Sequence, residues 1–133
     1  MTIAEAIKRI DTLKPNRYKD KEKVMWLSEL DGQVHTEILM THQHDEEIAP
    51  FVPYEYTDPV EGEEPAWKDI VLLVPFPYSE VYEHWLASKM DVANAEINKY
   101  ATDKELFNTA YLSYGDYYTR THMPVQHVRE FQL

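Results

Sequence analysis

The chain has 133 residues and a mass of 15.8 kDa, the size of one domain that can bury its own core. Apolar residues make up 44% and aromatic residues 13% of it, which excludes an intrinsically disordered protein. The absence of cysteine excludes disulfides, cysteine-ligated metals and thiol catalysis, and the net charge of −11 opposes binding to nucleic acid or to anionic membrane surfaces.

The first predicted helix spans residues 2–13. Thr2 and Glu5 form a capping box at its start, and Pro15 disfavours helical geometry just beyond its end. Its apolar stripe has helical spacing and consists of Ile3, Ala6, Ile7 and Ile10.

The second predicted helix spans residues 20–41, with Asp20 as its N-cap. One face is apolar and consists of Val24, Leu27, Leu30, Val34 and Ile38. Gly32 lowers helix propensity, so a turn at residues 31–32 is an alternative. Because the stripe continues in phase through it, we expect one helix in which Gly32 permits close packing.

The middle of the chain, residues 43–77, is predicted to be irregular and acidic. It contains six of the eight prolines, which prevent a long helix. Within it, residues 45–69 hold nine acidic residues and one lysine, so this segment carries −8 and the rest of the chain only −3. We expect residues 45–69 to form an exposed acidic arm, in which Glu55, Asp58, Glu61, Glu63 and Glu64 are prominent.

The apolar run at residues 70–74 is too short and too isolated for a sheet. It is expected either to pack on the helices as a strap or to pair with another chain. Two more helices are predicted after this run, so the sequence predicts an all-α fold. The chain is expected to form one domain over residues 1–133, a small bundle of about four helices with an extended tail at residues 125–133.

Two further helices are predicted at residues 79–100 and 102–122. Thr102 and Glu105 form a capping box at the start of the second, and Pro124 ends it. Both carry apolar residues at helical spacing, and we expect Trp85 in the core together with Leu27.

Two groups of polar residues are candidates for chemistry. Residues 42–47 combine ligand types that suit a divalent metal, namely His42, His44, Asp45, Glu46 and Glu47. A run that leaves a helix for a loop is poorly preorganised, so a solvated helix end is the alternative. Glu80 and His84 share a helix face, but no second metal-binding motif completes them. We expect no catalytic residue, no metal site and no cofactor.

Ten tyrosines are unusual for this length. Two lie in the acidic arm and four in the last predicted helix, at residues 111–118. Arg120 is the only basic residue within a few positions of these four, so a stacking platform for single-stranded nucleic acid is disfavoured. Core packing and use in a protein interface both remain open, because an aromatic ring with a polar tip suits either role.

Several strings of residues, taken together, carry a resemblance to a known family. They are WLSELDG at residues 26–32, LVPFPY at 73–78, NAE at 94–96, FN at 107–108 and YTRTHMP at 118–124, with Tyr82, Trp85 and Tyr100 between them. This set resembles the small head–tail connector, or neck adaptor, proteins of tailed phages and prophages over residues 2–42 and 72–124. Residues 43–69 and the tail after Pro124 offer nothing to match.

The resemblance implies a helical bundle that assembles as a homo-oligomeric, commonly dodecameric, ring beneath the portal protein. Such a ring extends the DNA channel and docks the next neck or tail-completion protein, with genomic DNA only as passing cargo and no membrane partner. It implies a virion location, with assembly in the host cytoplasm, and no enzyme activity.

The tail is predicted to be a docking peptide for another chain, because Pro124 directs it away from the last helix. Its apolar residues are Val125, Val128, Phe131 and Leu133. Folding back onto the bundle as core is the alternative. Two other function classes also remain open: a small acidic inhibitor that mimics DNA, and a metal-dependent enzyme that uses the two histidines and the acids of residues 42–47.

Overall fold

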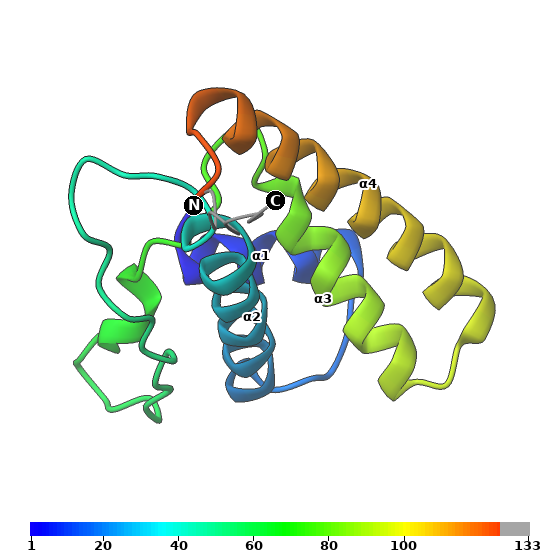
Figure 1. Ribbon diagram of the computed structural model, residues 1–133. Helices are drawn as coiled ribbons and strands as arrows, with labels where there is room; N and C mark the ends of the chain where they lie inside the picture. The colour runs from blue at the N-terminus through cyan, green and yellow to red at the C-terminus, as the bar shows by residue number, and fades with distance from the viewer. Residues whose placement is uncertain (126–133) are drawn as a thin grey trace, which may run out of the picture.

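The computed structural model describes residues 1–125 of the chain (Figure 1). Over these residues the fold is an all-α bundle of four helices, as predicted, and β pairing is limited to isolated bridges. The helices are α1 (Ile3–Leu13), α2 (Asp20–Val34), α3 (Glu80–Ala93) and α4 (Ile97–Thr121), with a π-helical turn η1 (His35–Leu39) and a 3₁₀ turn η2 (Ala66–Asp69). None of the described helices is long and apolar enough to span a bilayer.

The start of α1 follows the predicted cap. The Thr2 hydroxyl oxygen accepts a hydrogen bond from the backbone N–H of Glu5 at 3.2 Å, and the helix ends at Leu13. Its apolar stripe is buried, and α1 packs against α2, α3 and η2.

The predicted second helix is one rod that passes through Gly32, but its geometry changes along its length. After Val34 the rod continues as the π turn η1, in which the N–H of Met40 donates to the carbonyl of His35 at 2.9 Å. The predicted N-cap is wrong, since Lys19 is the N-cap and Asp20 is already helical.

The boundary between the last two helices differs from the prediction of 79–100 and 102–122. α3 ends at Ala93, and the chain reverses at residues 94–96 in a Schellman motif, with Ala95 at a φ of 55°. Two bonds close this motif: Ala95 N–H to the Val92 carbonyl at 3.1 Å and Glu96 N–H to the Asp91 carbonyl at 2.9 Å. Alanine in place of the usual glycine at this left-handed position explains why the sequence does not reveal the turn.

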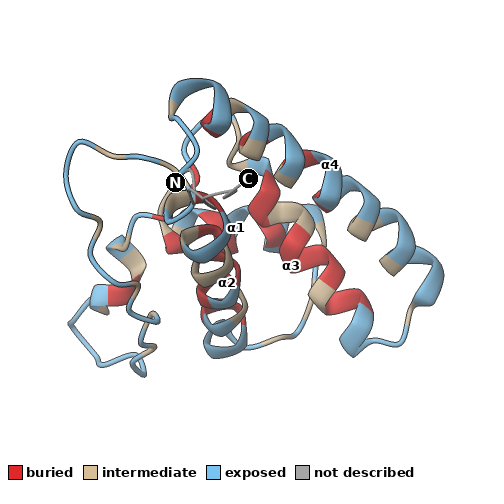
Figure 2. Cartoon of the chain, in the orientation of Figure 1, coloured by how far each residue is buried: buried red, intermediate tan, exposed pale blue. Residues whose placement is uncertain are grey.

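The four helices share one core, and Figure 2 shows buried residues along each of them, most densely on α3. The two predicted core residues are confirmed, since Leu27 is fully buried and Trp85 is 8% exposed. The indole N–H of Trp85 donates to the carbonyl of Trp26 at 2.7 Å, and its ring packs against Phe107 of α4. α3 and α4 run antiparallel as a hairpin (Figure 1).

The apolar strap at residues 70–74 lies along the beginning of α1. The N–H of Ile3 donates to the carbonyl of Ile70 at 3.0 Å, and the N–H of Leu72 donates to the carbonyl of Met1 at 2.9 Å. Leu72 and Val74 are buried, so the strap closes one side of the core.

An ion cluster joins the end of α1 to α3 and α4. Lys14 forms an ion pair with the fully buried carboxylate of Asp91, and its ammonium lies 3.7 Å from Asp103. The pKa of Asp103 is raised to about 6, first by burial and then by the hydrogen bond to Asp91 and the negative charge of Asp91, whereas the charges of Lys14 and His84 oppose the shift.

Candidate functional site

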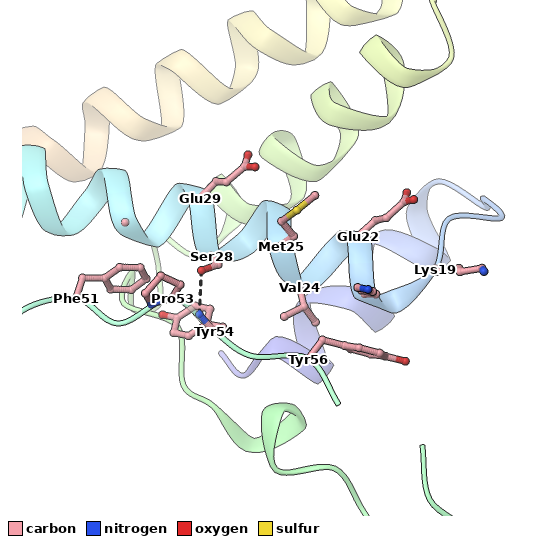
Figure 3. Close-up of a pocket in the computed structure, with 12 residues that line it drawn as sticks. Lys19, Glu22, Val24, Met25, Ser28, Glu29, Phe51, Pro53, Tyr54 and Tyr56 are labelled. Carbon is pink, nitrogen blue, oxygen red and sulfur yellow. Dashed lines mark hydrogen bonds between the residues drawn. The ribbon is translucent and has the colours of Figure 1, made fainter. Parts of the chain in front are cut away.

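An apolar groove of about 750 Å³ lies between α2 and the beginning of the acidic arm. Figure 3 shows Phe51, Pro53, Tyr54 and Tyr56 of the arm running beside α2, which contributes Val24, Met25 and Ser28. Charged side chains lie at its rim: Lys19, Lys21, Glu22 and Glu29, of which Glu29 forms an ion pair with Lys89 at 3.4 Å.

The groove exists because the arm comes very close to α2 at Gly32. A Cβ atom at this position would lie 3.3 Å from the Phe51 ring, which is closer than ordinary van der Waals contact. Farther along, the N–H of Tyr54 donates to the Ser28 hydroxyl at 3.0 Å. The small residue expected at Gly32 is therefore used for packing, and its partner is the arm.

A buried carboxylate of α2 ties the arm to the rest of the fold. Asp31 is fully buried and accepts three hydrogen bonds, from the Tyr82 hydroxyl at 2.6 Å, the Tyr54 hydroxyl at 2.5 Å and the Leu73 N–H at 3.0 Å. The Tyr82 hydroxyl in turn accepts from the Val74 N–H at 2.7 Å. One side chain of α2 thus holds the arm, the strap and α3 together.

Burial dominates the protonation of this network. It raises the pKa of Asp31 above its ordinary value, and the hydrogen bonds from Tyr54, Tyr82 and the Leu73 N–H oppose that shift. The pKa values of both tyrosines are also raised, first by burial and then by the nearby negative charge of Asp31. Both phenols therefore remain protonated donors at neutral pH, and the network serves as a structural clamp.

The predicted acidic arm is exposed. Its five prominent acids, Glu55, Asp58, Glu61, Glu63 and Glu64, all face solvent. Trp67 anchors the far end, because it is 4% exposed, its indole N–H donates to the Thr57 carbonyl at 3.2 Å and its ring packs against Tyr56. The arm is thus fixed at Phe51, Tyr54 and Trp67 and presents its carboxylates outward.

The candidate metal ligands of residues 42–47, for which no metal site is expected, lie where the segment after η1 meets the segment after α4. His42 contacts the Ile38 carbonyl and the Thr119 hydroxyl through its two ring nitrogens, and His44 contacts the Leu39 carbonyl and the Tyr118 hydroxyl. Within residues 1–125, no group of three or more His, Cys, Asp or Glu side chains has the geometry to hold a metal ion.

Two other polar side chains of the helices make structural contacts. Ser28 supports the arm, and Glu83 accepts from the Arg9 guanidinium at 2.8 Å. In α4, Tyr114 and Tyr118 are core residues, and Tyr111 and Tyr117 are half-buried and pack against that core.

Of the predicted tail-docking residues, only Val125 lies among the described residues. It is 41% exposed, and its N–H donates to the Thr41 carbonyl at 2.7 Å. Val128, Phe131 and Leu133 lie outside the described residues. Sequence reasoning missed the groove and the role of Asp31, and the only local signal for either was the glycine within an otherwise regular helix.

Comparison with models of protein families, with curated proteins and with solved structures finds no match to this chain. The function must therefore be argued from the groove, the arm and the bundle that carries them.

Proposed function

We propose that this chain is a structural head–tail connector of a tailed phage or prophage, without enzymatic activity. In this role it assembles as a homo-oligomeric ring beneath the portal, extends the DNA channel and docks the next neck or tail protein. The observation that carries the proposal is the acidic arm, an exposed, negatively charged surface anchored to a small helical bundle.

The arm suits a protein past which DNA must move. A negative surface repels phosphate and so prevents packaged DNA from adhering, and its influence extends about 8–10 Å at physiological salt. Alternatively, the same surface docks onto a basic neighbour in the neck. Both roles need the carboxylates held outward, and the anchors at Phe51, Tyr54 and Trp67 provide this.

The acidic arm also favours a second candidate, an inhibitor that mimics DNA and binds a basic DNA-binding protein. The two candidates differ in assembly state, because an inhibitor of this kind acts as a free monomer and a connector acts as a ring.

Light scattering after size exclusion, followed by electron microscopy, tests the proposal. The connector is expected to form closed rings alone or on the portal protein of the same phage. A chain that remains monomeric in both conditions contradicts it.

Charge reversal tests the role of the arm. The triple variant Glu61→Lys, Glu63→Lys and Glu64→Lys is expected to impair either ring docking or DNA ejection, because it replaces three exposed carboxylates with ammonium groups. A matched control reverses three exposed acids outside the arm, namely Asp20, Glu105 and Asp116. If both assembly and ejection are unchanged in the arm variant, neither role of the arm survives.

A further inference from the structure

Residues 75–77, Pro-Phe-Pro, form an exposed apolar knob just before α3. Phe76 is 86% exposed, more than any other large hydrophobic residue among those described, and both flanking prolines are also exposed. Three consecutive exposed apolar residues are unfavourable on a free surface and are typical of a binding element. The Pro-Phe-Pro knob is therefore a candidate for insertion into an apolar site.

The backbone on both sides of the knob is anchored. Before it, the N–H of Val74 donates to the buried Tyr82 hydroxyl. After it, the N–H of Tyr78 donates to the Pro75 carbonyl at 2.9 Å, and the Tyr78 ring packs 4.9 Å from that of Tyr117. A knob held in this way loses little conformational entropy when it binds, which favours affinity.

The apolar groove beside α2 lies elsewhere on the molecule. The knob precedes α3 at its upper end in Figure 1, whereas the groove runs between α2 and the arm, and no residue of the knob lines it. We propose that the Pro-Phe-Pro knob of one copy inserts into the groove of a second copy of this chain. This contact is the one that joins neighbouring copies in the proposed ring, so the inference rests on the proposed connector function.

The charges around the two surfaces are complementary. Apart from the Glu29–Lys89 pair, the groove rim carries Lys19, Lys21 and Glu22, an excess of one positive charge. Beside the knob, Glu80 is exposed in the first turn of α3. Within residues 1–125, neither rim lysine nor Glu80 has an ion-pair partner, so the knob side of one copy can neutralise the groove side of the next.

The shape of the contact determines the kind of assembly. Knob and groove are different surfaces, so each copy uses its knob on one neighbour and its groove on the other. Such a head-to-tail contact generates a ring when the rotation between copies closes. A second copy is therefore the occupant that fits both the groove and the connector.

Two single variants remove one surface each. Phe76→Ser removes the knob, and Met25→Glu places a charge in the groove at a residue that is 52% exposed. Each is expected to weaken assembly at least about 30-fold, as for a buried aromatic anchor, and to leave the melting temperature close to that of the unaltered chain. Leu112→Ser is the matched control, because Leu112 is an exposed apolar residue of α4 outside both surfaces.

Mixing the two variants distinguishes this contact from others. Phe76→Ser keeps the groove and Met25→Glu keeps the knob, so an equimolar mixture is expected to form heterodimers and nothing larger, as measured by light scattering. If both variants assemble like the unaltered chain, or if their mixture remains monomeric, the contact is overturned and the connector proposal stands. An unaltered chain that remains monomeric, alone and with the portal protein, overturns both.

Discussion

Replacing Asp31 with alanine should destabilise the chain and release the acidic arm. The substitution removes the acceptor for three donors, the hydroxyls of Tyr82 and Tyr54 and the N–H of Leu73. Tyr82 is fully buried and Leu73 is half-buried, whereas Tyr54 lies at the groove, where water can replace the lost bond. Each buried donor left unpaired costs about 1–3 kcal/mol, and removal of the buried carboxylate offsets part of this cost. The free energy of unfolding is therefore expected to fall by about 2–4 kcal/mol.

Urea unfolding measures this loss, and cleavage by a glutamate-specific protease within the arm measures its release. Tyr54→Phe is the graded control, since it deletes one half-exposed bond and should lower the free energy of unfolding by about 1 kcal/mol or less. An Asp31→Ala protein that unfolds at the same urea concentration as the unaltered chain, with its arm equally resistant to cleavage, would refute the clamp.

Three further outcomes are expected. The pKa of Asp103 is raised from 3.8 to about 6, so the stability that its protonated form contributes is present below about pH 4 and is lost as the pH rises through 6. Asparagine cannot ionise, so the free energy of unfolding of Asp103→Asn should increase relative to that of the unaltered chain between pH 4 and 7, as measured by urea unfolding. Ala95→Gly should raise the free energy of unfolding by up to about 1 kcal/mol in thermal or urea melts, because glycine adopts a positive φ without strain. Deleting residues 125–133 should abolish assembly and barely change the melting temperature, whereas a large decrease would assign the tail to the core.

The predictions that held depend on local signals. Thr2 and Glu5 are three residues apart, so the cap of α1 can be recognised in the sequence, and the stripe through Leu27 has a period set by the helix itself. The turn at Ala95 was hidden because the residue at its left-handed position is not glycine. The capping box at Thr102 was misleading, since that hydroxyl donates to the Asn98 carbonyl inside α4.

The sequence by itself determined the helical class of this protein, the burial of its apolar stripes and the concentration of its negative charge in one segment. Only the tertiary structure decided that Asp31 is a clamp, because its partners lie 23, 42 and 51 residues away along the chain. The groove beside α2 likewise needs the arm to return to Gly32. Periodicity and capping act within a few residues, whereas such contacts form only when the packed core brings distant segments together.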